Sequence, residues 1–243
     1  MKIAIMQPYL FPYIGYFQLI NAVDKFVIHD DVQFIKAGWI NRNRILVNHH
    51  EHLFTFSLKK NSSYLNINER YFSDNFDEEK NKLFRTLKNS YGKSKNFKEV
   101  FSLIQEILNV NHTDKDISKI ITRSLIMICD YLEIRTPIIT SSEMEKNSDV
   151  AGEKRVIEIN KQLNSTHYIN PIGGVELYSE ENFLKHNIQL SFLKSRPINY
   201  IQNGAEFLPW LSIIDVLMFN TTEEIIGMLN EYDFVQSANV SVT

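Results

Sequence analysis

The fold class is indicated near the start of the chain, by the stretch Met6-Gln7-Pro8-Tyr9-Leu10-Phe11-Pro12-Tyr13-Ile14-Gly15-Tyr16-Phe17. The apolar residues 3–5 before it suit a short buried strand, and its two prolines exclude regular strand pairing. Apolar residues then repeat at helical spacing until residues 25–28 begin a second strand. A strand, a loop, a helix and a strand in this order form the unit of a parallel sheet, whose ligands gather at the carboxyl ends of the strands.

Polar and charged side chains follow the second strand, in the segment 29–44. Buried carboxylates are costly unless they are paired, and basic side chains follow them within a few positions. A mixture of carboxylates, imidazole, cations, indole and amides suits the recognition of a polar, charged small molecule. The alternative is a local ion-pair network on a solvated hairpin. The candidate proton acceptors are His29, Asp30 and Asp31, and the candidate contacts after them are Lys36, Trp39, Asn41, Arg42 and Asn43.

Two loops are expected to reach the same edge of the sheet as this segment. The aromatic loop after the first strand forms one wall of a candidate pocket, or its rings simply pack over the sheet edge. The irregular loop 196–204 follows the last expected parallel strand, and after it Ser212 and Asp215 form a variant of the capping box at a helix start. The candidate contacts in the two loops are Tyr9, Tyr13, Tyr16, Tyr200 and Gln202.

Two blocks of sequence, one towards each end of the chain, carry a family resemblance. The first block contains Gln7-Pro8-Tyr9, Gly15-Tyr16-Phe17, Asp24, Asp30, Val32-Gln33-Phe34, Trp39 and Asn41-Arg42-Asn43. The second block contains Tyr200-Ile201-Gln202 and the run 207–217. Together they resemble the opening and closing signatures of the WbqC-like family, so the resemblance spans almost the entire chain. It adds Gln7 and Gln33 to the candidate substrate contacts.

The resemblance implies a function that the residues alone do not show. WbqC-like proteins are associated with gene sets for bacterial surface polysaccharide, such as the O-antigen of lipopolysaccharide. They are described as transferases of an amino acid, glycine in particular, to an amino sugar. The implied partners are a nucleotide-linked amino sugar and an activated amino-acid donor such as a charged tRNA, with ATP as a candidate cofactor. Such a reaction needs a base for the acceptor amine and a stabilised acyl oxyanion.

Two other classes of function stay open. One is a non-catalytic module that binds a nucleotide sugar within a polysaccharide pathway. The other is a nucleotidyltransferase-like enzyme, because the order of the first elements resembles that of cytidylyltransferases and class I aminoacyl-tRNA synthetases. Those proteins carry a Gly-His pair at the start of the first helix, where this chain has Gly15-Tyr16. A tyrosine with an ordinary pKa near 10 cannot act as a cationic phosphate clamp at neutral pH.

The remaining pattern predicts a single α/β domain over residues 1–235, followed by a polar tail, 236–243. We expect an open, mostly parallel sheet of the nucleotide-binding, Rossmann-like kind, with a helical insertion around residues 74–115. The helical segments expected there and after it are 76–90, 97–108 and 117–132. Strands and helices should then alternate over 137–141, 151–163, 167–170, 180–186 and 188–193.

Composition fits a globular cytoplasmic enzyme. The chain has 243 residues with a formal net charge of −3, which argues against a nucleic-acid footprint over the whole surface. Its one cysteine, Cys129, cannot form an intramolecular disulfide. No apolar stretch approaches the length of a membrane span, so no membrane insertion is expected. Strand alternation puts His50 and His52 on one face and His49 on the other, so no metal site is predicted.

Overall fold

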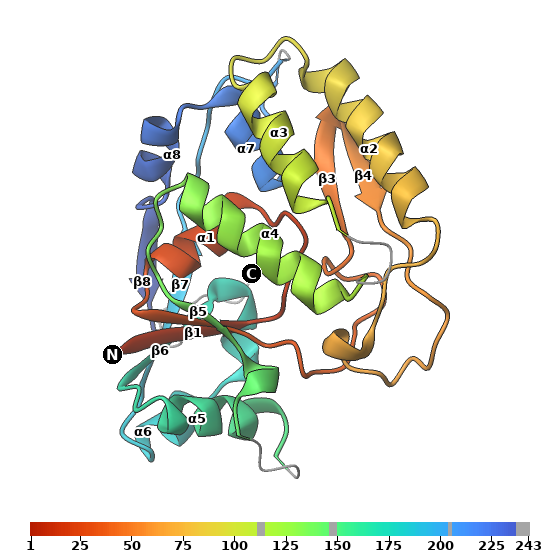
Figure 1. The fold of residues 1–243 in the computed structure, drawn as a ribbon. Coiled ribbons are helices and arrows are strands. Elements are labelled where there is room, and N and C mark those ends of the chain that lie inside the picture. Colours follow the sequence, from red (N-terminus) through yellow and green to blue (C-terminus); the bar gives the residue numbers. More distant parts are fainter. Residues whose placement is uncertain (111–114, 146–149, 204–205, 237–243) are drawn as a thin grey trace.

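The computed structural model describes residues 1–110, 115–145, 150–203 and 206–236 (Figure 1). Its main feature is a six-stranded sheet in the order β5-β2-β1-β6-β7-β8, in which only the pairing of β7 with β8 is antiparallel. This confirms the predicted α/β fold with an open, mostly parallel sheet. The strands are β1 (Lys2–Met6), β2 (Lys25–Ile28), β5 (Ile138–Thr140), β6 (His167–Pro171), β7 (Gln189–Ser195) and β8 (Tyr232–Val235).

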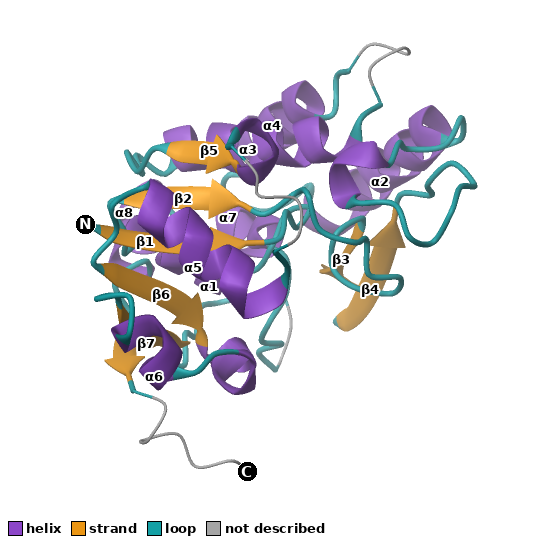
Figure 2. Ribbon diagram, turned by 90° about the horizontal axis from the view of Figure 1, so that it is seen from below, coloured by secondary structure: helices purple, strands orange, loops and turns teal. Residues whose placement is uncertain are grey.

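Helices cover both faces of this sheet, because successive strand residues point to opposite faces. Phe26 and Ile28 belong to a core shared with α1 (Ile14–Asn21), α4 (Ile117–Tyr131) and α7 (Ile213–Phe219). Val27 belongs to a second core, shared with α5 (Gly152–Gln162) and α6 (Glu180–Leu184). Figures 1 and 2 show the two sets of helices on opposite sides of the sheet.

A second unit lies beyond the carboxyl ends of the parallel strands, toward which the arrows of β1 and β2 point in Figure 2. It consists of a two-stranded hairpin and the helices that follow it. Asn48 and His49 form the hairpin turn, both with positive φ, as a two-residue turn of this kind requires. The elements are β3 (Arg42–Val47), β4 (His50–Thr55), the 3-10 turn η1 (Ile67–Glu69), α2 (Phe76–Tyr91) and α3 (Phe97–Ile107).

The predicted helices at 76–90, 97–108 and 117–132 are confirmed as α2, α3 and α4. Strand β8 was not predicted from the sequence; it is only four residues long and carries one charge, Asp233, on an edge of the sheet. Before it lies the short helix α8 (Thr222–Met228). Of the predicted tail 236–243, only Gln236 falls within the described residues. No helix in the described ranges is both long and apolar enough to cross a membrane.

Chain topology positions the candidate site. From β1 the chain adds β2 and β5 on one side, and β6 and β7 on the other, so the direction of strand addition reverses between β1 and β6. The carboxyl ends of all five strands share one edge. There the N–H of His29 donates to the carbonyl of Met6 at 2.8 Å, which holds the segment after β2 against the loop after β1.

Candidate functional site

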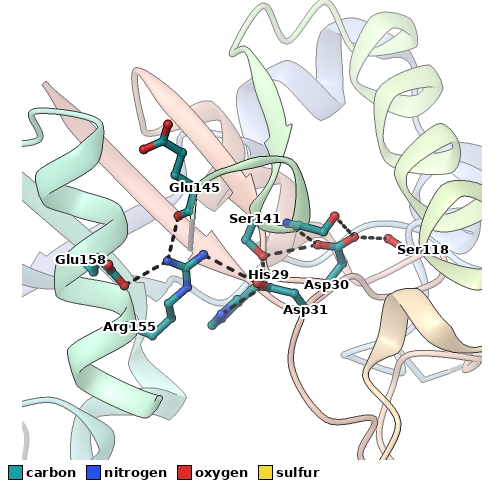
Figure 3. Close-up of polar contacts among 9 residues, drawn as sticks. His29, Asp30, Asp31, Ser118, Ser141, Glu145, Arg155 and Glu158 are labelled. Carbon is teal, nitrogen blue, oxygen red and sulfur yellow. Dashed lines mark hydrogen bonds and ion pairs between the residues drawn. The ribbon is translucent and has the colours of Figure 1, made fainter. Parts of the chain in front are cut away.

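Asp30 is buried at the end of β2, on the side of the sheet that α4 covers (Figure 3). Its Oδ2 accepts hydrogen bonds from the hydroxyls of Ser118 and Ser142, each at 2.8 Å. Its Oδ1 accepts from the backbone N–H of Ser142 at 3.0 Å and the hydroxyl of Ser141 at 3.3 Å. Four donors therefore satisfy a carboxylate that is only 2% exposed, which is the condition for burying it. Asp30 thereby ties the end of β2 to α4 and to the turn after β5.

Asp31 turns to the opposite side of the sheet, toward α5, because neighbouring residues after a strand alternate in direction (Figure 3). Its carboxylate lies 3.6 Å from the guanidinium of Arg155 and 3.7 Å from Nε2 of His29, and it accepts a hydrogen bond from Ser141. Arg155 also pairs with Glu158 at 3.1 Å. The hydroxyl of Ser141 contacts both aspartates, so it joins the two sides of the predicted catalytic group.

A cavity of about 680 Å³ opens between α4 and the ends of β2 and β5. Asp30 lies in its wall, together with the two hydroxyls that donate to Oδ2, those of Ser118 and Ser142. Among the predicted site residues, Asp30 alone lines this cavity as the described chain forms it. The other polar lining residues are Asn68, Glu106, Asp116, Lys119, Thr122, Arg123, Thr140 and Glu143.

The aromatic loop after β1 is locked in place from two distant segments. Phe11 has φ of 45°, in the left-handed region, and its carbonyl accepts from Asn43 Nδ2 at 2.8 Å and from the Ser212 hydroxyl at 2.7 Å. Asn43 also donates to the carbonyl of Leu10 at 3.1 Å and is 5% exposed. These bonds hold a strained backbone that would otherwise relax. The structure thus gives Asn43 a supporting role within the loop, whereas its substrate contact stays a prediction.

The tyrosines of this loop have different surroundings. Tyr16 is buried, its hydroxyl donates to the carbonyl of Gln7 at 2.9 Å, and burial raises the pKa of its phenol well above the usual value. Tyr9 packs its ring 5.9 Å from that of Tyr16. Tyr13 packs edge-on against Trp210 with 5.6 Å between ring centroids, and Trp210 is 60% exposed. Of the predicted contacts in this loop, Gln7, Tyr9 and Tyr13 are partly exposed, whereas Tyr16 is buried.

Tyr200 and Gln202 bind a buried carboxylate. Asp215, at 0% exposure, accepts from the hydroxyls of Tyr200 at 2.6 Å and Tyr91 at 2.7 Å, and from Gln202 Nε2 at 2.8 Å. Burial raises the pKa of Asp215, against the lowering effect of these three bonds. The expected capping box is half right. Ser212 does cap α7, but the Asp215 side chain turns to the tyrosines, since its burial requires donors.

The guanidinium of Arg42 donates hydrogen bonds to backbone carbonyls. Its Nε donates to the carbonyl of Gly38 at 2.9 Å, and a second N–H donates to the carbonyl of Ala37. The ring of Trp39, which is 38% exposed, has its centroid 5.7 Å from Cζ of Arg42 and 5.0 Å from Cζ of Arg44. The turn before β3 therefore presents an indole with two cations beside it.

Of the last three predicted contacts, Asn41 is partly buried, and Gln33 and Lys36 are exposed. Asn41 donates to the carbonyl of Phe56 at 2.7 Å, which pairs the start of the hairpin with its end. Gln33 is exposed and donates to the carbonyl of Ser63 at 3.1 Å. Lys36 is exposed to solvent. A direct role of these side chains in substrate binding stays a prediction.

The partners of the two aspartates were not predicted from the sequence. Ser141 and Ser142 directly follow β5, so the rule that identified His29 to Asp31 after β2 applies to them equally. Ser118 begins α4, where serine is ordinary, and carries no signal of its own. Arg155 stands in a helix rich in charged residues, where a further charge carries no signal of its own.

The comparisons with known proteins agree with the resemblance seen in the sequence. An uncharacterized protein of Mycobacterium tuberculosis is 29% identical over 225 residues, which are 92% of this chain and 95% of that protein. No solved structure matches the chain. The family model described as the WbqC-like protein family matches residues 7–226, which include the loop after β1, both aspartates and the Asp215 network. The chain therefore belongs to the WbqC-like protein family.

Proposed function

We propose that the protein transfers an aminoacyl group, with glycyl as the first candidate, to the amine of a nucleotide-linked amino sugar for bacterial surface polysaccharide. The family resemblance supplies the reaction class. The observation that carries the proposal for this chain is the placement of Asp30 in the wall of an open cavity, beneath the Ser118 and Ser142 hydroxyls. A buried carboxylate that accepts hydrogen bonds from two hydroxyls in a cavity wall is suited to receive protons from an amine in that cavity.

Amide formation needs two proton transfers. The acceptor ammonium loses one proton before its nitrogen attacks the acyl carbon. As the C–N bond forms and the bond to the donor carrier breaks, the nitrogen loses a second proton. In the proposed mechanism the Ser142 hydroxyl accepts a proton from the amine while it passes its own to Asp30 Oδ2, 2.8 Å away. His29 and Asp31, held by Arg155, are the second candidate acceptor pair.

Strand order supports a place for the nucleotide. In open α/β sheets, ligands bind beyond the carboxyl ends of the strands where the order reverses, and here that point is between β1 and β6. With the hairpin left out, the parallel strands run in the order 3-2-1-4-5, as in the Rossmann-like architecture. Tyr9, Tyr13 and Trp39 are proposed as pocket walls, and Lys36 and Arg42 as contacts to phosphate or to the acyl oxyanion.

The test is a donor and acceptor screen. Purified protein is offered nucleotide-linked amino sugars together with glycine and ATP, with charged tRNA, or with an aminoacyl thioester, and the sugars are analysed by mass spectrometry. A glycyl adduct is expected under one donor condition. Asp30→Asn should lower its rate by about 10²-fold or more, since a general base is removed. The exposed Glu223→Gln, on α8, is the matched control and should keep the rate.

One observation favours the second candidate, a module that binds the nucleotide sugar without reacting. Asp30 already accepts four hydrogen bonds from the protein, so it takes up a proton only when one donor turns away. Binding of the sugar nucleotide without adduct under every donor condition supports the module and rejects the transferase. Nucleotidyl transfer predicts pyrophosphate release from a nucleoside triphosphate. It is less favoured, because Tyr16 is buried and its hydroxyl is engaged by a carbonyl.

A further inference from the structure

The cavity beside Asp30 is built along one face of α4. Lys119, Thr122, Arg123 and Ile126 all line it, and their spacing of three and four residues puts them side by side on the helix. At about 680 Å³ it is within the size range of small-molecule pockets, roughly 300–1,000 Å³. Most of its lining residues carry polar or charged side chains, and Ile126 and Met127 add apolar wall, so it suits a small ligand that has both polar groups and a carbon framework.

Two polar atoms of the lining residues have no hydrogen-bond partner within the described part of the chain. They are Oγ1 of Thr122 and Oδ1 of Asn68, and both are buried. A threonine hydroxyl inside a helix ordinarily donates to the carbonyl three or four residues earlier, as Thr86 does to Lys82 in α2 at 3.0 Å. Thr122 forgoes that bond. Because these two atoms belong to residues that line the cavity, each can make a hydrogen bond to a ligand without giving up one within the protein.

The Thr122 hydroxyl can change direction by rotation about χ1. Threonine in a helix populates two χ1 wells, so the rotation costs little. A ligand hydroxyl in the cavity can then both donate to and accept from Thr122. Asn68 Oδ1 needs a donor, which a sugar hydroxyl or an ammonium supplies.

The charges of the cavity favour a cation. Four carboxylates line it against two cations, and both cations are engaged within the protein. Lys119 lies 3.9 Å from the carboxylate of Asp116, and Arg123 donates to the carbonyl of Asn109 at 3.2 Å. The uncompensated negative charge attracts an ammonium and repels a phosphate.

We infer that this cavity binds the amino-sugar ring itself, with its ammonium facing Asp30 and Glu143 and its hydroxyls facing Thr122 and Asn68. The inference rests on the proposed function for the choice of an amino sugar. It also states a selectivity, because the protein should prefer a sugar with a free amine over the same sugar with the amine acetylated. The phosphates of a sugar nucleotide would lie outside the cavity.

The experiment is NMR titration of the full chain with glucosamine, N-acetylglucosamine and glucose at about pH 6, where an amine of this class is protonated. Glucosamine should bind at least about fivefold more tightly than the other two, and should shift the amide signals of Ser118 and Thr122. Glu143→Gln should remove most of that preference. Thr122→Val keeps the shape of the side chain and removes the hydroxyl, so it should weaken all sugars by about fivefold.

Ser124→Ala is the matched control for Thr122→Val. The Ser124 hydroxyl on α4 is also buried, and it has no hydrogen-bond partner among the residues that the structure describes. It does not line the cavity, so its removal should leave every affinity unchanged. Equal affinities for the three sugars, no binding of any of them, or an unchanged affinity in Thr122→Val would overturn the inference. Glucosamine binding without a glycyl adduct in the screen above keeps the inference and rejects the transferase. A glycyl adduct together with an unchanged affinity in Thr122→Val keeps the transferase and rejects the inference.

Discussion

Replacing Asp215 tests whether its buried network anchors the loop after β7. Asp215→Ala leaves the hydroxyls of Tyr91 and Tyr200 without their acceptor. Each buried, unpaired hydroxyl costs about 1–3 kcal/mol, and removal of a buried charge returns part of that cost. We expect the free energy of unfolding to fall by about 2–4 kcal/mol in Asp215→Ala and by about 1–2 kcal/mol in Asp215→Asn, which keeps one acceptor oxygen.

The two tyrosines should differ. The Tyr91 hydroxyl also accepts from the backbone N–H of Leu46 at 2.7 Å, so Tyr91→Phe leaves both that N–H and Asp215 short of a partner. Tyr200→Phe removes one donor to Asp215, which keeps Tyr91 and Gln202. The expected losses are about 2 kcal/mol for Tyr91→Phe and about 1 kcal/mol for Tyr200→Phe.

Equilibrium unfolding in urea measures these losses, with Glu223→Ala as an exposed control that should stay within about 0.5 kcal/mol of wild type. The pKa of Asp215 is raised in the folded state, so its contribution to stability is full below the unfolded pKa and is lost as pH rises through the folded pKa. The stability gap between wild type and Asp215→Asn should therefore widen as pH falls from 7 towards the ordinary aspartate pKa of about 4. A loss below about 1 kcal/mol in Asp215→Ala would refute the anchoring role.

Four further predictions concern single side chains. A Cβ on Gly15 would lie 2.3 Å from the ring of Tyr13, so Gly15→Ala should lower the free energy of unfolding in urea by about 1–3 kcal/mol; an unchanged value would contradict this packing. Burial first, and nearby positive charge second, lower the pKa of His167, so its stabilising effect is present above the unfolded pKa and lost as pH falls through the folded one. Wild type should thus lose stability relative to His167→Gln between pH 7 and pH 5. Parallel profiles of unfolding free energy against pH for the two proteins would contradict this prediction. Burial raises the pKa of Cys129 to about 12, so a thiol reagent at pH 8 should modify it only after unfolding, and fast reaction with folded protein would argue against its burial. Arg42→Lys should lower the free energy of unfolding by about 1 kcal/mol, because the backbone hydrogen bonds of the guanidinium are lost. Calorimetric titration with the nucleotide sugar tests whether Arg42 binds an anionic group of the substrate, and equal affinities of wild type and Arg42→Lys would reject that contact.

Much of the architecture could be predicted because it depends on local pattern. The apolar runs at 3–5 and 25–28, with helical spacing between them, indicated parallel strands, and the polar segment after the second run marked the edge where Asp30 lies. The family signatures are likewise contiguous stretches. Hydrophobic periodicity reflects residues a few positions apart, and such residues interact in the same way whatever the rest of the chain does.

The partners of those residues could not be predicted in this way. Alternation alone shows that Asp30 and Asp31 point in opposite directions, but which helix covers each side depends on the order of strands in the sheet. Ser118 is 88 positions from Asp30, and Ser212 is 201 positions from the Phe11 carbonyl that it binds. A buried carboxylate or carbonyl needs a donor, yet any nearby donor suffices, so packing of distant elements selects it.

The sequence by itself thus determined most of the helices and strands, the edge where polar side chains gather and the family. Tertiary structure decided which of those side chains line a cavity and which hold the fold. Asn43, Tyr200 and Gln202 are matched in the sequence to the same signatures as Asp30, but their hydrogen bonds go to a loop carbonyl and to Asp215. The physical reason is that a polar side chain serves either the protein or a ligand according to the donors and acceptors that long-range packing brings within reach.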